Sequence, residues 1–466
     1  MQSTEDVRCA LFFFIQPHMS NNPLCHPERS GARGDTESRD LRETYSTKQH
    51  DPQLPGPSTS PPLWVGFARD DSGVLEWEKH ENNEHRKDAA MTTTIGLRRR
   101  EKPVDKTLLT ILAMLLMLGL LTLFSATYYK AQDGGDALSE VKKQLFGVAV
   151  GAAAMSMTMR IPYHFWQRRK VVVGGVIVSA ILLVLVVIPG IGRSINGSRR
   201  WLALGPLSFQ PGELAKYATV LFMAMTLTAR GRKVERLFTG ILPVLIVPGI
   251  MFLLILEQPN LSTAGTIIIV SVLMVMLAGA KWRHMLLLGA GGLMVGAYYA
   301  WSAEYRRERL LSFTDPFAKM SDEGYQLSQS LIAFGSGGLF GMGLGQGRQK
   351  YAYLPYPESD FIFAIVGEDF GLAGCLAVIA LFVAFMIAGM RVAMRCEDQF
   401  GCLLAAGIIG MISVQAFINM GVVVGILPTT GLPLPFFSAG GTSLSITMAA
   451  VGIVLNISRS GSNNLR

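Results

Sequence analysis

Long apolar runs, each about the length of a bilayer crossing, recur along the chain from residue 107 onward. Eight of them carry few or no charges: 107–129, 144–159, 171–192, 213–229, 237–256, 261–280, 285–303 and 361–390. Residues 399–458 contain no Asp, Glu, Lys or Arg, and three prolines (Pro428, Pro433 and Pro435) interrupt them near the middle, which predicts two more helices. The pattern predicts an all-α integral membrane protein with about ten transmembrane helices and a long external loop between helices 7 and 8.

The first 90 residues follow a different pattern. Their apolar run at 10–15 is too short to span a bilayer, and residues 21–90 show no helical or strand period, so we expect disorder there. Met91 begins a polar and basic lead, 91–106, of the kind that opens many bacterial membrane proteins. We interpret 1–90 as a disordered tail or a mis-called start, with a regulatory cytoplasmic arm as the alternative. Residues 107–458 then form the membrane domain, and 459–466 a short cytoplasmic tail.

Charge supports a membrane location. Half of the 466 residues are hydrophobic and 16% are charged, below the ~25% of ordinary soluble chains. The net charge of +8 could indicate nucleic-acid binding, but the basic residues cluster in short gaps between apolar runs, which membrane topology explains better. The gaps 160–170, 230–236, 281–284 and 391–398 are richer in Lys and Arg than the alternate gaps. The positive-inside rule therefore places both ends of the membrane domain in the cytoplasm and the loop 304–360 outside.

Cysteine spacing indicates neither a metal site nor a disulfide framework. Three of the five cysteines (Cys375, Cys396 and Cys402) lie in or beside apolar runs, where cysteine usually packs as a small apolar residue.

The external loop is the first candidate for chemistry. Its segment 309–326 mixes carboxylates, basic residues and turn formers, and either Asp315 or Asp322 could act as a general base toward an attacking hydroxyl. The alternative is that Asp315 merely starts a turn with Pro316 and that Asp322 is solvated. The glycine-dense segment 335–347 matches neither a Walker loop nor a dinucleotide turn, so we expect an irregular re-entrant stretch buried against protein.

Several charges fall where a bilayer makes them costly, which suggests function. Glu213 and Lys216 are three residues apart at a helix start, so they lie on one face and can pair. Glu368 and Asp369 interrupt an apolar helix that begins after Asp360. A structural ion pair or a snorkelling side chain is the alternative for each. The external arginines Arg193, Arg199 and Arg200 go against the charge rule and suit an anionic ligand such as a pyrophosphate.

Three segments resemble the shape, elongation, division and sporulation (SEDS) family of polymerases: residues 207–216; residues 324–330 followed by 354–355 and 360–368; and residues 427–443. The likeness spans about residues 105–460, and three long motifs in order make it highly specific. It is closer to the cell-division branch than to the elongation branch, because residues 428–432 read Pro-Thr-Thr-Gly-Leu.

The resemblance implies a peptidoglycan glycosyltransferase that polymerises lipid II at the outer face of the bacterial inner membrane during division. An external aspartate would deprotonate the acceptor sugar hydroxyl, which displaces undecaprenyl pyrophosphate with inversion, and basic residues would stabilise the leaving group. Lipid II, an undecaprenyl-linked glycan strand, a class B penicillin-binding protein and other division proteins are the implied partners. The candidate substrate-binding residues are Arg199, Arg200, Glu213, Lys216, Gln326, Asp360, Glu368 and Ser438.

The sequence departs from the family where the base is expected. A gapless comparison places Lys319 at the family's aspartate, so Asp322 and Asp315 are the substitutes, and we favour Asp322. Asn260 also stands where the family commonly has Asp. No cofactor is implied; a divalent cation bound by external acidic residues is an open alternative, although no ligand spacing favours one. A lipid II flippase or transporter and a non-catalytic division scaffold are the rival functions. The sequence shows no repeated halves of the kind common in transporters.

Overall fold

The computed structural model describes residues 103–128, 138–195, 198–204, 207–302, 304, 307, 313–318, 324–351 and 353–460. Within them lie ten long helices: α3 (Lys106–Thr127), α4 (Ser139–Arg160), α5 (Arg169–Val187), α6 (Pro211–Arg230), α7 (Leu242–Leu256), α8 (Leu261–Leu277), α9 (Trp282–Trp301), α12 (Ile362–Arg395), α13 (Gln399–Val423) and α14 (Gly441–Ser458). Four short helices join them: η3 (Tyr163–Gln167), η4 (Gly231–Glu235), η5 (Leu237–Ile241) and α11 (Tyr325–Gly337). Each of the eight predicted apolar runs overlaps one of these long helices, and residues 399–458 contain the other two, which confirms the predicted fold class. The predicted tail 1–90 and most of the lead 91–106 lie outside the described residues.

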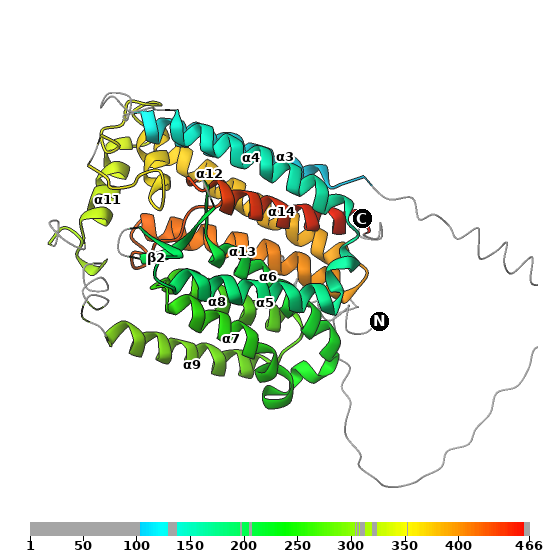
Figure 1. Ribbon diagram of the computed structural model, residues 1–466. Coiled ribbons are helices and arrows are strands. Elements are labelled where there is room, and N and C mark those ends of the chain that lie inside the picture. Colours follow the sequence, from blue (N-terminus) through cyan, green and yellow to red (C-terminus); the bar gives the residue numbers. More distant parts are fainter. Residues whose placement is uncertain are drawn as a thin grey trace, which may run out of the picture. The chain divides into compact units, whose positions relative to one another are not determined.

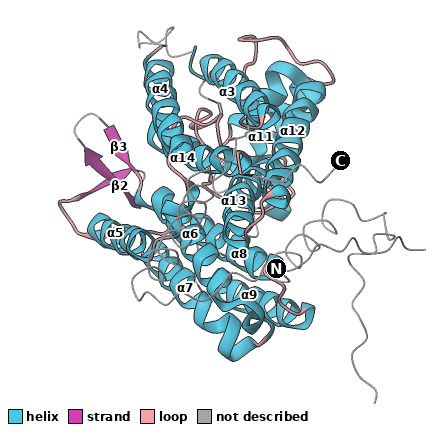
Figure 2. Ribbon diagram, turned by 90° about the vertical axis from the view of Figure 1, so that its right-hand side faces the viewer, coloured by secondary structure: helices cyan, strands magenta, loops and turns pink. Residues whose placement is uncertain are grey.

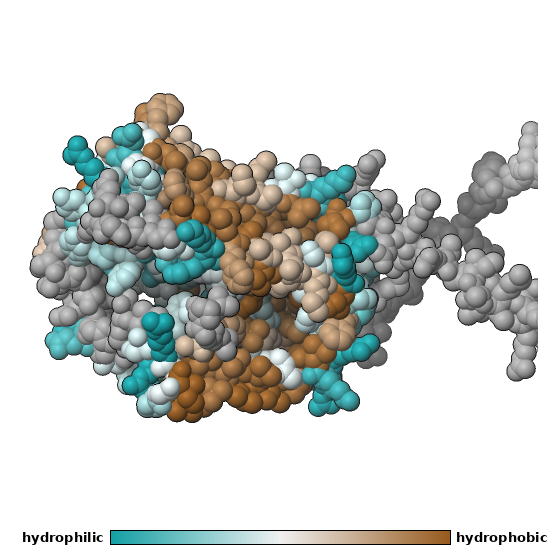
Figure 3. Space-filling view, turned by 45° about the horizontal axis from the view of Figure 1, so that its top comes forward, coloured by the Kyte–Doolittle hydropathy of each residue, from teal (hydrophilic) through white to brown (hydrophobic). Residues whose placement is uncertain are grey.

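The apolar character of the helices suits a bilayer. Six spans in the described residues are long and apolar enough to cross a membrane: 106–127, 169–187, 237–256, 362–395, 399–423 and 441–458. α8 is a shorter apolar helix. On the face seen in Figure 3, apolar residues cover the middle of the helices and hydrophilic residues gather toward the two ends. This is the surface of a multi-pass membrane protein.

Local sequence determines where several helices begin. The Asp105 carboxylate accepts a hydrogen bond from the Leu108 amide at 3.0 Å and caps α3. Asn260 caps α8 through the Thr263 amide at 3.3 Å, and Asp398 caps α13 through the Gly401 amide at 2.9 Å. Pro211 opens α6, where its missing N–H costs nothing. Each cap satisfies an amide that the first helical turn leaves without a partner.

The long helices run alternately up and down, so the connections fall at two ends of the bundle (Figure 1). The start of α3 meets the end of α14, where the Asp105 amide donates to Ser458 Oγ at 3.1 Å; we call this the termini end. The opposite end, with α11 and the described parts of the connections 188–210, 302–361 and 424–440, is the loop end. All four Lys- and Arg-rich gaps lie at the termini end, as the topology prediction requires. α13 is the most buried span and lies at the centre when the bundle is viewed along its length (Figure 2).

A small antiparallel sheet, which the sequence did not predict, lies between α5 and α6 at the loop end. It comprises β1 (Gly192–Ile195), β2 (Ser198–Leu204) and β3 (Leu207–Phe209) in the order β1-β2-β3. Leu202 pairs with Gly192 on one side and with Phe209 on the other. The sheet therefore turns the predicted external loop after α5 into a rigid support for its arginines.

Glycines bring α4 and α14 into close contact. A Cβ at Gly147 would lie 2.5 Å from Gly441 Cα, and one at Gly452 would lie 2.1 Å from Thr158 Oγ1. The Thr158 hydroxyl also donates to the Ala449 carbonyl oxygen at 2.8 Å, which ties the two helices together. Small residues at such a crossing let two backbones approach inside a membrane.

Candidate functional site

The predicted pair at the start of α6 is formed and completely enclosed. Lys216 Nζ lies 2.9 Å from Glu213 Oε1, and the side chains are 1% and 2% exposed. Lys216 also donates to Gln415 of α13, and the Ser443 hydroxyl of α14 donates to Glu213 Oε2 at 2.6 Å. Every partner comes from another helix, so the pair joins α6, α13 and α14 at the loop end. Breaking such a buried pair is strongly destabilising because it leaves one charge uncompensated.

Asp360 lies just before α12, and both its backbone carbonyl and its side chain accept hydrogen bonds. Its carbonyl oxygen accepts from Asn419 Nδ2 at 2.7 Å, and the same amide donates to the Leu432 carbonyl at 2.7 Å. The Ser359 hydroxyl donates to Asp360 Oδ1 at 2.9 Å. Asn419 thus fastens the start of α12 to the segment that connects α13 and α14.

Ser438 fastens the same two segments a second time. Its hydroxyl donates to the Ser359 carbonyl at 2.6 Å and accepts from the Leu434 amide at 2.8 Å. Because both its donor and an acceptor position are used by the backbone, the geometry supports a role in positioning Ser359 and Asp360. Ser438 was predicted to bind substrate, and nothing in these contacts requires that.

Arg200 and Asp360 both lie beside Gly431. A Cβ at Gly431 would lie 3.2 Å from Asp360 Oδ2 and 3.8 Å from an Arg200 guanidinium nitrogen. Arg200 reaches this place from β2, where its Nε donates to the Gln258 carbonyl at 3.0 Å and a terminal nitrogen donates to the Pro259 carbonyl. The sheet, the α7–α8 connection and the α13–α14 connection therefore meet at one cation and one carboxylate.

Arg199 does not join Arg200. The two residues are neighbours on β2, so their side chains point to opposite faces of the sheet, and Arg199 is exposed. Arg199 and Ser194 are register partners next to an irregularity in the β1–β2 pairing. Only Arg200 of the two lies beside Asp360.

The helix α12 is broken near its start, and the glycine-dense segment is inserted into the break. Gly371 has φ +66°, outside the helical range. The carbonyl oxygens of Glu368 and Asp369 accept from the Met342 and Gly343 amides at 2.9 and 3.1 Å. The amides of Leu372 and Ala373 donate to the Gly338 and Leu339 carbonyls at 2.9 and 3.1 Å. In an unbroken helix these four groups would bond one another, so the loop replaces both lost bonds.

Only glycine fits where the loop meets the break. A Cβ at Gly341 would lie 2.2 Å from the Asp369 carbonyl oxygen, and one at Gly371 would lie 2.4 Å from the Gly341 amide nitrogen. Both residues have positive φ. The predicted irregular stretch is thus confirmed as irregular from Gly338 onward. Its side chains Leu339 and Phe340 are exposed rather than buried, and the contact with α12 is made by backbone.

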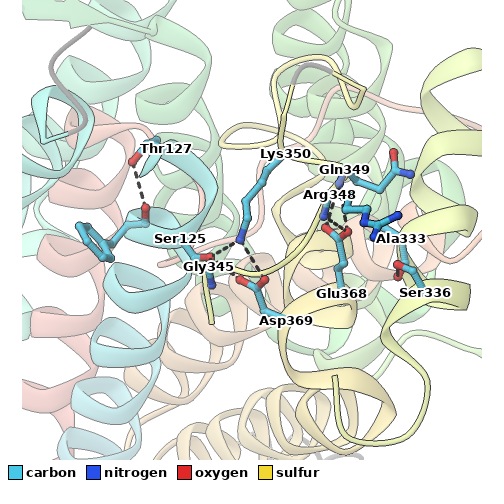
Figure 4. A network of polar contacts seen from close by, with 11 residues as sticks. Ser125, Thr127, Ala333, Ser336, Gly345, Arg348, Gln349, Lys350, Glu368 and Asp369 are labelled. Carbon is cyan, nitrogen blue, oxygen red and sulfur yellow. Dashed lines mark hydrogen bonds and ion pairs between the residues drawn. The ribbon is translucent and has the colours of Figure 1, made fainter. Parts of the chain in front are cut away.

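The carboxylates of Glu368 and Asp369 hold the end of this loop (Figure 4). Glu368 Oε1 accepts from the Arg348 and Gln349 amides at 2.5 and 3.0 Å. Asp369 Oδ1 accepts from Lys350 Nζ at 3.0 Å, and both side chains of this ion pair are 0% exposed. Glu368 was predicted to bind substrate, which stays a prediction; the contacts of its carboxylate in the structure are with the loop backbone.

Ser125 of α3 completes this second buried cluster. Its hydroxyl donates to Asp369 Oδ2 and accepts from Lys350 Nζ at 2.9 Å and from the Gly345 amide at 3.2 Å. The cluster therefore connects α3, the glycine-dense loop and α12, as Figure 4 shows.

The two candidate bases are placed unequally. Asp315 is exposed, and its Oδ1 accepts from the Ala318 amide at 3.1 Å, the pattern of an aspartate that starts a turn. Asp322 lies outside the described residues. Gln326 is half-buried in the first turn of α11.

Sequence reasoning missed Lys350, Ser125, Gln415 and Asn419. Gln415 and Asn419 are polar and four residues apart on an otherwise apolar helix, which places them on one face, so this pattern could have identified them. Lys350 and Ser125 carry no such pattern, because a lysine in a polar loop and a hydroxyl in a helix are ordinary residues. Among the described residues, no three His, Cys, Asp or Glu side chains converge as metal ligands would.

Cys375, Cys396 and Cys402 are buried free thiols, which confirms the predicted packing role; Cys9 and Cys25 lie outside the described residues. At the termini end, Cys396 Sγ donates to Asp398 Oδ1 at 3.3 Å, and the Tyr163 hydroxyl donates to the same oxygen. Burial raises the pKa of Tyr163 above its ordinary value, and the hydrogen bond to Asp398 raises it further. The tyrosine therefore remains a protonated donor.

A bundle of ten long helices with buried ion pairs gathered at its loop end defines a polytopic membrane protein with a polar site at one end. Residues 106–463 match the family model of the FtsW/RodA/SpoVE cell cycle proteins. The chain belongs to this family.

Curated relatives extend the match over nearly their whole length. Stage V sporulation protein E of Bacillus subtilis is 40% identical over 356 residues, which cover 76% of this chain and 97% of that protein. A probable peptidoglycan glycosyltransferase FtsW of Geobacter sulfurreducens is 38% identical over 366 residues, which cover 78% of this chain and 98% of that protein.

Solved structures share the fold. A chain from a structure titled as the coordination of polymerization and crosslinking by a peptidoglycan synthase complex gives a TM-score of 0.64 at 28% identity, covering 76% of this chain and 98% of that one. The rod shape determining protein RodA of Thermus thermophilus gives 0.57 at 28% identity, covering 78% and 98%.

Proposed function

We propose that this protein is a peptidoglycan glycosyltransferase that polymerises lipid II into glycan strands during cell division. The observation that carries the proposal is that Arg200 and Asp360 both lie beside Gly431, at the end of a membrane bundle whose relatives bear the name peptidoglycan glycosyltransferase. The repeated name FtsW among those relatives supports the division role.

The loop end faces the outside of the cytoplasmic membrane in this proposal. The Lys- and Arg-rich gaps all fall at the opposite end, and positive-inside bias assigns that end to the cytoplasm. Arg200, Asp360 and Asp315 then lie where an externally displayed lipid-linked sugar would be presented. The protein acts at the division septum.

The reaction is a displacement at the anomeric carbon of the growing strand. A base removes the proton from the acceptor sugar hydroxyl, whose oxygen forms the new glycosidic bond. The bond to undecaprenyl pyrophosphate breaks, and that group leaves with the electron pair and with inversion. Arg200 is the cation best placed to stabilise the negative charge that develops on the leaving pyrophosphate, because two backbone carbonyls already orient its guanidinium.

Asp322 is the favoured base and Asp315 the alternative. One Asp315 carboxylate oxygen already accepts a hydrogen bond from the Ala318 amide within a turn, which supports a turn-forming role for Asp315 and not a catalytic one. The Asp322→Ala variant should therefore lose polymerisation by ~10²- to 10⁴-fold, the usual contribution of a general base, whereas Asp315→Ala should lose several-fold. Gel analysis of glycan strands made from lipid II by purified protein measures both, with membrane yield as the control. Full activity in both variants would refute the assignment.

The same assay separates the rival functions when a class B penicillin-binding protein is supplied as partner. The structural likeness to a chain from a peptidoglycan synthase complex supports such a partner. In vesicles with lipid II in the outer leaflet only, a polymerase makes strands, a flippase moves lipid II without making them, and a scaffold does neither.

A further inference from the structure

We propose that Lys350 is a positioning residue, whose ion pair with Asp369, bridged by Ser125, holds the glycine-dense loop in the break of α12 and thereby fixes Asp360. The loop meant here is 338–350. The expected effect on activity rests on the proposed function, whereas the attachment of the loop by Lys350, Asp369 and Ser125 does not.

The loop and the first part of α12 form one mechanical unit. Residues 362–370 are a short helical segment that begins two residues after Asp360 and ends at the break at Gly371. At the end of this segment, the carbonyl oxygens of Glu368 and Asp369 accept hydrogen bonds from the loop amides of Met342 and Gly343. A displacement of the loop would therefore tilt the segment that carries Asp360.

The ion pair is the connection between this unit and the rest of the bundle. Lys350 belongs to the loop, Asp369 to the short segment and Ser125 to α3, and each bonds the other two. The Gly345 amide makes a third contact with Ser125 at 3.2 Å. Because α3 runs through the bundle, the three side chains fasten the unit to a fixed support.

Because Lys350 and Asp369 are buried, we infer that neither reacts with substrate. Both side chains are 0% exposed, and a group that transfers a proton must reach the reacting atom directly or through one water. A buried pair also adds little stability compared with apolar residues of similar volume, whereas removal of one partner is costly. The difference between losing one partner and replacing both makes the role of the pair testable. A positioning role requires that residues 350 and 369 pack against each other, and two apolar side chains can do this without charge.

The experiment compares Lys350→Met, Asp369→Val and the double variant. Each single variant leaves one buried charge, so we expect hydrogen exchange in the peptides covering 338–350 to increase and lipid II polymerisation to fall at least ~10-fold, since displacement of a site by about 1 Å can cost ~10²-fold. The double variant should recover both the slow exchange and turnover to within a few-fold of the wild type. Its pH–rate profile should keep the wild-type shape, because no group that transfers a proton has been removed.

A milder pair of variants covers the case in which the double variant does not fold. Ser125→Ala removes only the bridging hydroxyl and should accelerate loop exchange and lower turnover several-fold. Ser413→Ala is the matched control, because the Ser413 hydroxyl is buried in α13 without a hydrogen-bond partner in the described residues. The control should change neither measurement.

Two results would overturn the proposal. One is a folded double variant whose loop exchanges slowly but whose turnover stays as low as that of the worse single variant, which would place a reacting group at residue 350 or 369. The other is wild-type exchange and turnover in the single variants or in Ser125→Ala. If the wild-type protein makes no polymer, the proposed function fails instead, and the exchange measurement still decides whether Lys350, Asp369 and Ser125 attach the loop.

Discussion

Gly431 matters at the scale of a single residue because Asp360 and Arg200 both lie against the place that a side chain would occupy there. An added methyl group would lie 3.2 Å from Asp360 Oδ2, so the carboxylate must shift by a few tenths of an ångström. We expect Gly431→Ala to lower lipid II turnover roughly three- to tenfold with little change in thermal stability, because small misplacements of reacting groups are costly. Gly440→Ala is the matched control in the same connection, since its Cβ would make an ordinary 3.7 Å contact with Ser443. Equal activity in the two variants would remove Gly431 from the site.

Residues could be predicted where their chemistry is local. Glu213 and Lys216 lie one helical turn apart, so pairing followed from spacing alone, and the 2.9 Å contact confirms it. Arg199 and Arg200 looked equivalent in the sequence, yet the alternation of β2 separates them. The role of Glu368 could not be foreseen, because its partners are backbone amides 19 and 20 residues away that only the folded loop supplies.

At the scale of elements, close packing of α4 on α14 makes its own prediction. A side chain at Gly147 would collide with Gly441 Cα, so Gly147→Leu should lower the free energy of unfolding by about 1–3 kcal/mol or more. Gly174→Leu in α5 is the control, because a Cβ there meets nothing within 4 Å, and its effect should stay within about 0.5 kcal/mol. Labelling of the buried Cys375, Cys396 and Cys402 thiols during heating in detergent reports unfolding in both. Equal midpoints would mean that the crossing tolerates separation.

The transmembrane helices could be predicted because a bilayer forces each span to satisfy its backbone hydrogen bonds within itself. Every long helix therefore appears in the sequence as an apolar run. The break in α12 is different, because Gly371 is one glycine among several in that run and nothing nearby marks it. Its cause is the loop 338–343, which precedes the helix in the chain and bonds to it only in the folded protein.

For the whole molecule, the charge distribution predicts a single orientation. Gln346 and Lys233 are both exposed, at the loop end and the termini end respectively. In a variant with Cys9 and Cys25 replaced by Ser, a membrane-impermeant maleimide should label Gln346→Cys in intact spheroplasts and Lys233→Cys only after lysis. The reverse pattern would invert the proposed topology and remove the site from the outer face.

The sheet of β1, β2 and β3 shows why the arrangement of the whole molecule was harder to predict from the sequence than the transmembrane spans. Its strands are three to seven residues long and lie in a segment that reads as a charged loop. These segments become recognisable as strands only through their pairing in the folded protein, and this pairing also supports Arg200. The sequence could place the candidate residues at one end of the bundle, but the meeting of Arg200, Gly431 and Asp360 depends on contacts between segments far apart in the chain.

The inserted loop also sets an order for biogenesis. A ribosome delivers residues 338–343 before α12, yet two amides and two carbonyls of α12 can bond to the loop only after α12 has been made. Until the loop docks, these four groups can bond one another in a continuous helix, so docking exchanges two bonds within α12 for four bonds to the loop. The break at Gly371 should therefore form late, when the loop docks onto a helix that already exists.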